Sequence, residues 1–354
     1  MKQAAFLPGQ QLEDYRLQKL IRKGVMAELY SARDVRLNKG VVIKILRKPF
    51  RGMKNYEKQF LKEARIQANL DNPHIIQVFR MFDYQDMTCF VMPHVKGTDL
   101  ARVIRKAARR RVERGESGIG ALSLERALHI FAQILEGVGF VHKYRVIHGD
   151  IKPSNILLDR QGRARITDFG VSLMLPRGLS ETQQLLPGGT PYYMSPEQFL
   201  NDEMDFRSDI YSLGVTLFQM LTGDMPSGRK RSVNELLEYH MEGSLERTAG
   251  VLEKHGNIPS IIKKAILKAL ENDPRKRHQS CLEFSLAIKE DPRQELYSEL
   301  LRLSLMSKGD ISKVERAYLQ RIAGKKGLSP EEAEALEAGI RKELGVSFKG
   351  VDKG

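Results

Sequence analysis

One short segment of the chain holds an acid, a base and an amide side chain. Asp150, Lys152 and Asn155 lie within six consecutive positions, and Asp168 follows Asn155 thirteen residues later. A carboxylate can orient a hydroxyl group, and the oxygen atoms of Asn and Asp are ligands for hard divalent cations. Phosphoryl transfer requires this combination, because it depends on positioning and on neutralising phosphate charge.

Two upstream residues complete this set. Lys44 lies in the β-like run Gly40–Leu46, and Glu63 lies on the helical repeat Tyr56–Leu70. A lysine held by a carboxylate can place its ammonium group over phosphates. The sequence therefore predicts a phosphotransfer site that is assembled from distant segments.

The elements that must position these residues form a strand-rich first part and a helical second part. Alternating apolar residues predict two strands within Tyr15–Arg33 and a strand pair at Val78–Phe82 and Thr88–Met92. Polar loops between the later helices carry the chemical residues. The long helices are expected at Leu124–His142, Ser208–Leu221 and Ile258–Leu270.

The end of the chain, residues 291–354, is predicted to be a helical extension that docks on the main domain. Ser312 and Glu315 have the spacing of a capping box, and Ser329 with Pro330 predicts a second helix start. Nothing in this extension indicates chemistry. The apolar stripes expected on its helices are Val314/Tyr318/Ile322 and Leu336/Ile340/Leu344.

The chemical residues stand within an ordered series of motifs that resembles the bacterial, Hanks-type serine/threonine protein kinases. The motifs are VVIK ending at Lys44, Glu63 on its helix, HGDIKPSN (148–155), DFG (168–170), GTPYYMSPE (189–197), SDIYSLGV (208–215) and DPRKR (273–277). The resemblance runs from residue 14 to residue 290. It implies transfer of the γ-phosphate of ATP to serine or threonine hydroxyls of protein substrates.

The same resemblance implies an α+β, two-lobed protein kinase fold. A small β-rich N-lobe would cover residues 14–92, the hinge residues 93–95, and a larger helical C-lobe residues 96–290. The C-terminal extension would then follow the kinase domain, as a candidate site for a regulatory partner.

The resemblance also assigns roles to individual residues. Lys44 would hold the α- and β-phosphates of ATP and pair with Glu63. Asp150 would orient the acceptor hydroxyl, and Lys152 would face the γ-phosphate. The implied ligands of Mg²⁺, or of Mn²⁺ in its place, are Asn155 and Asp168.

Further contacts with ATP are implied for the phosphate loop, the adenine pocket and the hinge. These residues are Ile21, Arg22, Gly24, Leu29, Val42, Met92, Pro93, Val95 and Leu157. The activation segment would hold Ser180, Thr182 and Thr190, of which the first two are expected autophosphorylation sites.

Three residues depart from the family pattern. Arg22 and Ala27 replace two glycines of the phosphate loop, so ATP binding is expected to be weaker or differently shaped. Gly149 replaces the arginine that holds a phosphorylated activation loop, so dependence on that phosphorylation should be reduced. Two alternatives follow: an inactive, pseudokinase-like nucleotide-binding or scaffold protein, and a small-molecule kinase of the aminoglycoside or choline type.

Composition adds a positive charge to be explained. Lysine and arginine total 58 against 44 acidic residues among 354, a formal net charge of +14. Seven of these cations lie between Arg102 and Arg114, where we expect either a solvated helix end and loop or a docking patch for an acidic protein substrate. Nucleic acid is disfavoured as the partner, because no aromatic residues are interleaved with the cations.

The sequence also predicts where the protein resides. Two cysteines provide no disulfide framework, and the first residues lack the apolar run of a signal peptide. No stretch has the apolar length of a membrane span. We therefore expect a cytoplasmic protein with no membrane span.

Overall fold

Two compact units make up the chain, residues 1–287 and residues 288–354. The structure is a computed structural model that describes residue 6 and residues 8–346. Within these ranges the description leaves out residues 25, 48–49, 86, 114, 116–120, 170–189, 201, 229–232, 242–243, 256–257, 290–291 and 309.

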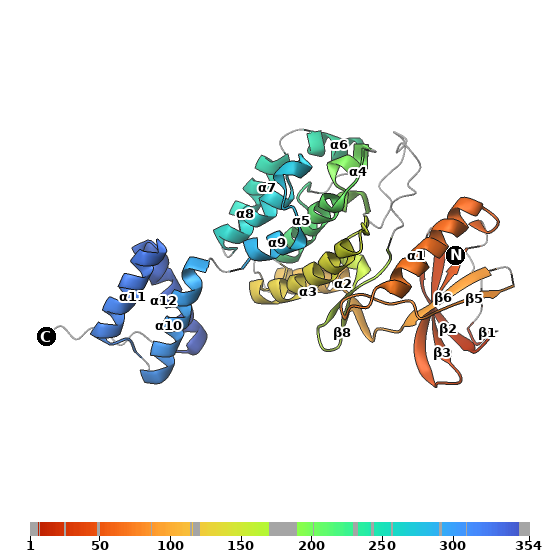
Figure 1. Cartoon of the computed structure of the whole chain (residues 1–354), viewed down its shortest axis with the longest axis horizontal. Coiled ribbons are helices and arrows are strands. Elements are labelled where there is room, and N and C mark those ends of the chain that lie inside the picture. Colours follow the sequence, from red (N-terminus) through yellow and green to blue (C-terminus); the bar gives the residue numbers. More distant parts are fainter. Residues whose placement is uncertain are drawn as a thin grey trace. The chain divides into compact units, whose positions relative to one another are not determined.

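An antiparallel sheet of six strands forms the first part of the larger unit, in the order β1-β2-β3-β4-β6-β5 (Figure 1). One sheet face covers a core that includes Leu17, Tyr30, Ile43 and Val91. The strands are β1 (Gln11–Leu12), β2 (Tyr15–Lys23), β3 (Ala27–Asp34), β4 (Lys39–Leu46), β5 (Arg80–Tyr84) and β6 (Met87–Pro93).

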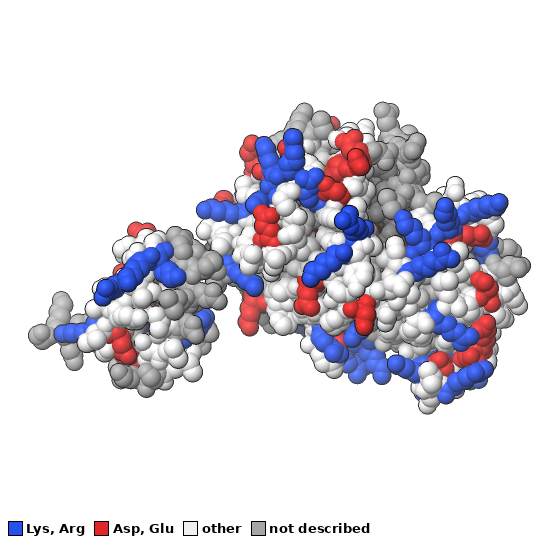
Figure 2. Space-filling view, viewed as in Figure 1, with Lys and Arg blue, Asp and Glu red and all other residues white. Residues whose placement is uncertain are grey.

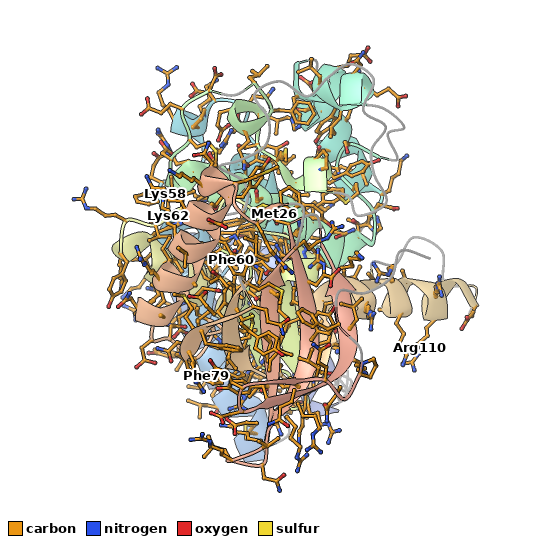
Figure 3. All side chains as sticks on the ribbon, turned by 90° about the vertical axis from the view of Figure 1, so that its right-hand side faces the viewer. Met26, Lys58, Phe60, Lys62, Phe79 and Arg110 are labelled. Carbon is orange, nitrogen blue, oxygen red and sulfur yellow. The ribbon has the colours of Figure 1, made fainter. Side chains whose placement is uncertain are left out.

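Helix α1 (Lys54–Asn69) packs on the other face of this sheet. Phe60 of α1 lies against Phe90 of β6, with ring centroids 4.6 Å apart. Figure 3 shows Phe60 on the side of the helix that faces the sheet and Lys58 on the opposite side. This amphipathic packing fixes Glu63, which is buried on the same helix.

Helices build the second part of the larger unit around α5 (Phe206–Thr222), which is buried along nearly its whole length. Asp205 caps the start of α5, and Gly223 ends it in the left-handed conformation with φ +83°. The other helices are α2 (Leu100–Glu113), α3 (Leu124–Lys143), α4 (Pro196–Leu200), α6 (Val233–Met241), α7 (Ser244–Glu253), α8 (Ser260–Ala269) and α9 (Cys281–Ala287).

A small second sheet carries the loops that hold the chemical residues. Its order is β7-β8-β9, from β7 (Gly97–Asp99), β8 (Ile156–Asp159) and β9 (Ala164–Ile166). A Cβ atom on Gly97 would lie 1.8 Å from the carbonyl oxygen of Leu158, so only glycine allows this approach of the strands. Short 3₁₀ turns among the described residues of the unit include η2 (Pro153–Asn155), η4 (Thr190–Tyr193) and η5 (Pro274–Lys276).

A buried ion pair joins α4 to the segment that follows η5. Nη1 and Nη2 of Arg277 lie 2.7 and 2.8 Å from the two carboxylate oxygens of Glu197. The Ser208 hydroxyl also donates to Glu197, and three backbone carbonyls accept from the guanidinium group. The charges are thus desolvated but fully hydrogen-bonded.

The smaller unit is a cluster of three helices, α10 (Pro292–Lys308), α11 (Lys313–Lys326) and α12 (Pro330–Leu344). The capping box of Ser312 and Glu315 is confirmed. The stripe predicted for α11 is wrong at two positions, because Val314 is 80% exposed and Tyr318 is 54% exposed. The buried face of α11 contains Leu319 and Ala323 instead, which pack with α10 and α12.

No helix in the described ranges combines the length and the apolar character needed to cross a membrane.

Candidate active site

The loop between α3 and β8 is anchored through its backbone to α5. The carboxylate of Asp209 accepts hydrogen bonds from the backbone N–H groups of His148 (2.9 Å) and Gly149 (2.8 Å). Gly149 has φ +73°, a conformation that favours glycine. Nε2 of His142, in α3, lies 2.8 Å from the same carboxylate, so Asp209 holds both the end of α3 and the segment before Asp150.

His148 has the hydrogen bonds of a neutral imidazole. Its Nδ1 atom accepts from the backbone N–H of Asp150 (3.2 Å), and its Nε2 atom lies 3.1 Å from the carbonyl oxygen of Thr167. Because the ring is fully buried, burial lowers its pKa despite the nearby carboxylates. We infer that this side chain positions the loop and does not carry protons.

The Asp150 carboxylate is held by two neighbours. Nζ of Lys152 lies 2.7 and 2.6 Å from its two oxygens, and Nδ2 of Asn155 lies 2.8 Å from Oδ2. Asn155 also donates to the backbone carbonyl of Asp150 (2.9 Å). The turn η2 thus folds the segment back on itself and fixes the direction of the acid.

The amide oxygen of Asn155 indicates whether these residues suit a metal ion. Its Oδ1 atom is buried and has no hydrogen-bond partner among the described residues. A buried acceptor without a partner is unfavourable unless something binds to it. Asp168, the other expected ligand, supplies carboxylate oxygens, so the donor set is the all-oxygen type that Mg²⁺ and Mn²⁺ accept.

Lys44 joins the N-terminal sheet to Asp168. Its Nζ atom lies 2.6 Å from Oε1 of Glu63 and 2.9 Å from Oδ1 of Asp168. Burial alone lowers the pKa of the ammonium group, but the two carboxylates outweigh it and the pKa is raised. Burial raises the pKa of Glu63 to about 7, although Lys44 opposes that shift.

The strand register explains why Arg22 reaches the same carboxylate. Arg22 of β2 pairs with Leu29 of β3, Leu29 pairs with Lys44 of β4, and Lys44 pairs with Phe90 of β6. Directly opposed residues on neighbouring strands share one face of a sheet. Nη1 of Arg22 lies 3.6 Å from Oδ2 of Asp168.

The environment of Asp168 favours its charged form. The residue has φ +64°, which is uncommon for a side chain other than glycine. Burial raises the pKa of its carboxyl, but Lys44, Arg22 and Lys152 together hold that pKa below its ordinary value.

The structure brings together most of the residues expected around adenine. Val42, Met92, Leu29, Val95 and Leu157 belong to one apolar cluster, with the last three partly buried. Two further expected residues lie beside it. Pro93 ends β6, and the N–H of Gly24 closes the β2–β3 turn by donating to the carbonyl of Ala27 (2.9 Å).

One expected residue lies apart from this cluster, three fall outside the description, and one residue was missed. Ile21 is 46% exposed and does not belong to the cluster. Ser180 and Thr182 fall outside the described residues, as does the side chain of Thr190. Sequence reasoning missed Gln198, whose Nε2 atom donates to the carbonyl of Gly149 (2.9 Å); only its position directly after the SPE sequence could have pointed to it.

Comparison with known proteins identifies this arrangement. The model of the protein kinase domain family matches residues 15–285. The chain belongs to the protein kinase family. Protein kinases are two-lobed, with a β-rich N-lobe and a helical C-lobe, so the predicted fold is confirmed.

Two bacterial protein kinases are similar to this kinase domain. The chain is 31% identical over 276 residues to the serine/threonine-protein kinase PrkC of Bacillus subtilis, and 29% identical over 282 residues to PknB of Mycobacterium tuberculosis. Each match covers 78% of this chain but only 40% and 42% of those two proteins. The chain therefore matches less than half the length of these relatives.

A solved structure agrees on the fold of this kinase domain. The kinase domain of Mycobacterium tuberculosis PknI superposes with a TM-score of 0.56 at 19% identity. The match covers 80% of this chain and 98% of the PknI chain.

Proposed function

We propose that this protein transfers the γ-phosphate of ATP to serine or threonine hydroxyls of protein substrates, through a kinase domain of residues 14–290. The observation that carries the proposal is that two charged groups of residues lie on neighbouring segments: the backbone N–H of Thr167, next to Asp168, donates to the carbonyl oxygen of Asn155 (3.0 Å), and the charge of Lys152 acts on Asp168. The Lys44–Glu63–Asp168 set comes from the sheet, α1 and the segment after β9, and the Asp150–Lys152–Asn155 set comes from one loop. All the polar groups that phosphoryl transfer needs are therefore present.

ATP would lie against the sheet face that carries Lys44. The apolar cluster of Leu29, Val42 and Leu157 would enclose the adenine, and Met92 with the hinge residues 93–95 would border its edge. The ammonium group of Lys44, held by Glu63, would bind the α- and β-phosphates. Gly24 and Arg22 would lie over the phosphates, while Ile21 would contribute from the edge of β2.

Asn155 and Asp168 would hold Mg²⁺ or Mn²⁺, since they supply the free amide oxygen and the charged carboxylate described above. The ion, when bound, neutralises negative charge on the β- and γ-phosphate oxygens.

Asp150 would accept the hydrogen bond of the acceptor hydroxyl and take its proton as phosphate transfer proceeds. Such a general base contributes roughly 10²- to 10⁴-fold to the rate. The contacts with Lys152 and Asn155 hold the carboxylate in one orientation before the substrate arrives. Lys152 would then face the γ-phosphate.

A nucleotide-binding protein without phosphotransfer is the second candidate. It is favoured by one observation, the Arg22 guanidinium beside Asp168, because a cation there competes with the metal ion. Measuring transfer of labelled γ-phosphate by the full chain to serine, threonine and tyrosine peptides decides between the two. We expect transfer to serine or threonine that is lost in Asp150→Asn and kept in Asp83→Asn, a carboxylate on β5. Binding of a fluorescent ATP analogue by the wild type, without transfer to any of the peptides, would support the second candidate.

We further propose that the protein acts in the cytoplasm, on substrates with acidic residues around the acceptor. Both cysteines, Cys89 and Cys281, are free and buried, which suits a reducing compartment. A regulatory partner would bind the helical unit of residues 288–354. Thr190 and the residues Ser180 and Thr182 would form part of the activation segment.

A further inference from the structure

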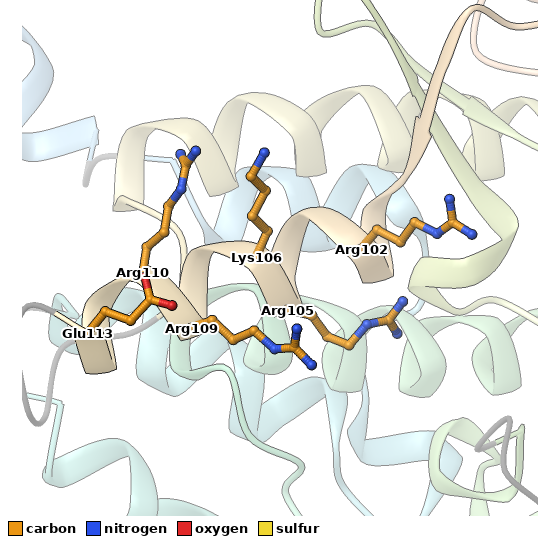
Figure 4. A pocket seen from close by; sticks show the side chains of 6 residues that line it. All are labelled: Arg102, Arg105, Lys106, Arg109, Arg110 and Glu113. Atoms are coloured by element: carbon orange, nitrogen blue, oxygen red, sulfur yellow. The ribbon is translucent and has the colours of Figure 1, made fainter.

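Helix α2 carries a row of exposed cations that the proposed phosphotransfer does not use. The five are Arg102, Arg105, Lys106, Arg109 and Arg110, called here the basic face. Figure 4 shows Arg105 and Arg109 pointing the same way, with Lys106 and Arg110 together on an adjacent side. These side chains and Glu113 surround a hollow of about 460 Å³. The sequence left two interpretations of this stretch open, a solvated helix end with a loop or a docking patch, and the structure shows a helix that continues to Glu113.

The opposite face of α2 fixes the helix beside the catalytic loop. Leu100 and Ile104 are buried, and Asp99 caps the helix by accepting from the backbone N–H of Arg102 (2.8 Å). The helix packs on η2, the turn that contains Asn155, and on the neighbouring strands β7 and β8. Arg105 is close enough to η4 for its charge to act on the Tyr193 hydroxyl. The basic face therefore begins near the residues that would receive the substrate.

The charges on this face are largely uncompensated. Arg102 pairs with Asp99 at 3.3 Å, but in the part of the chain that the structure describes no ion pair involves the other four cations. Like charges three and four residues apart destabilise a helix. An anionic ligand would relieve this repulsion.

The charge pattern is local. Figure 2 shows Lys and Arg interspersed with Asp and Glu over the visible face of the unit of residues 1–287, with no single field of one sign. Figure 3 shows α2 projecting from the body, with Arg110 near its outer end. Helix α2 itself has five exposed cations within nine residues, so a partner that recognises positive charge would meet all five along one helix.

We propose that the basic face is a docking surface for an acidic segment of the protein substrate, separate from the residues that flank the acceptor. This inference rests on the proposed protein kinase function. Four of the five cations are arginines, which bind carboxylates through two parallel hydrogen bonds. Helix α2 contains no aromatic residue on which a nucleic-acid base could stack, so a carboxylate-rich protein segment fits better than RNA or DNA.

The dimensions of the helix set the length of the segment. Arg102 and Arg110 are eight residues apart, which corresponds to about 12 Å along a helix. An extended peptide covers about 3.3 Å per residue, so roughly four residues span the row. A run of five or six Asp and Glu residues would contact the whole basic face.

The test uses the full-length chain and a serine peptide joined through glycine–serine linkers of several lengths to a tail of six glutamates or six glutamines. The variant Arg105→Ala/Arg109→Ala removes two cations one helical turn apart from the basic face. Its matched control, Arg321→Ala/Lys325→Ala, removes two exposed cations with the same spacing from α11.

We expect the glutamate tail to lower the KM of the wild type about tenfold relative to the glutamine tail, since two exposed ion pairs contribute about that much. The value of kcat should not change. The preference should disappear in Arg105→Ala/Arg109→Ala and remain in the control. Equal KM values of the wild type for both tails at every linker length would overturn the proposal. So would an equal loss of the preference for the glutamate tail in Arg105→Ala/Arg109→Ala and in the control variant.

A binding measurement separates this inference from the proposed function. Fluorescence anisotropy of the labelled glutamate-tailed peptide reports docking without phosphotransfer, so it tests the basic face even if no peptide is phosphorylated. A single-stranded oligonucleotide of equal charge is then added as a competitor. If it displaces the peptide, binds more tightly than the peptide, and loses this binding in Arg105→Ala/Arg109→Ala, the face binds nucleic acid and the proposal is overturned. Weaker binding of the oligonucleotide would support it.

Discussion

Nη1 of Arg22 lies 3.6 Å from Oδ2 of Asp168, so two cations, Arg22 and Lys44, contact the carboxylate that we assign to the metal ion. Lys44 is almost fully buried, whereas the Arg22 side chain is 47% exposed. The Arg22 contact is therefore the weaker one, and it can be exchanged for a metal ion or for phosphate.

Replacing Arg22 by glycine, the residue usual in this family at the first position of the loop, should strengthen metal binding. An exposed pair at this distance contributes about 1 kcal/mol or less, so the Mg²⁺ concentration for half-maximal nucleotide binding should fall up to about fivefold. Titration of Mg²⁺ against a fluorescent ATP analogue measures this. Arg22→Lys should behave like the wild type, and an unchanged Mg²⁺ dependence in Arg22→Gly would show that the two cations do not compete.

The double variant Ser180→Ala/Thr182→Ala should keep most of the phosphotransfer activity. Position 149, directly before Asp150, carries no cationic side chain that could bind a phosphorylated residue. Steady-state kinetics with a peptide acceptor, beside a mass-spectrometric check that the wild type is phosphorylated at these residues, measures the effect. Complete loss of activity would refute this expectation.

Breaking the buried pair of Glu197 and Arg277 should destabilise the kinase domain strongly. Glu197→Gln leaves the Arg277 guanidinium without its counter-ion and should cost about 3–5 kcal/mol of unfolding free energy. The double variant Glu197→Leu/Arg277→Met, which removes both charges, should lose less than Glu197→Gln alone. Urea denaturation measures the free energy of unfolding of each variant, and a double variant that loses as much as Glu197→Gln or more would contradict this expectation.

Stability should decrease on acidification because of a buried histidine. Burial lowers the pKa of His240 to about 4, and its Nε2 atom has no hydrogen-bond partner among the described residues. Between pH 6.5 and 4 the unfolded chain binds a proton that the folded chain does not. The free energy of unfolding therefore decreases as the pH is lowered. This residue alone accounts for about 2 kcal/mol between pH 7 and pH 5.

The comparison of wild type with His240→Phe tests this assignment. The variant loses the contact of Tyr211 with the ring, so it should be less stable at neutral pH, but its stability should change less between pH 7 and pH 5. Urea denaturation at pH 7 and pH 5 measures how much the free energy of unfolding of each protein changes between the two pH values. An equal change in the wild type and in His240→Phe would exclude His240 as a source of the acid sensitivity.

Much of the fold could be predicted because it depends on local periodicity. Alternation gave the strands that contain Arg22, Leu29 and Lys44, and the helical repeat gave the helix of Glu63. The kinase fold itself came from ordered motifs, each uninformative alone. The roles of the site residues toward ATP stay predictions, as do the domain bounds of 14–290.

Contacts that depend on tertiary packing could not be predicted. Nothing local places Arg22 beside Asp168 or Gln198 beside Gly149, since both contacts join distant segments. The error on α11 has a different origin. Positions 314/318 and 319/323 both fit a helical period, and only packing against α10 and α12 selects the second set.

The backbone anchor at Asp209 has a consequence for how this site can diverge. Since Asp209 accepts from the N–H groups of His148 and Gly149, the hold on the catalytic loop does not depend on which side chain stands at position 149. The left-handed backbone there adds only a modest penalty, about 1–2 kcal/mol, for residues other than glycine. Under the proposed function, exchange at position 149 would therefore change the side chain next to Asp150 while the contacts of Asp209 with the loop stay in place.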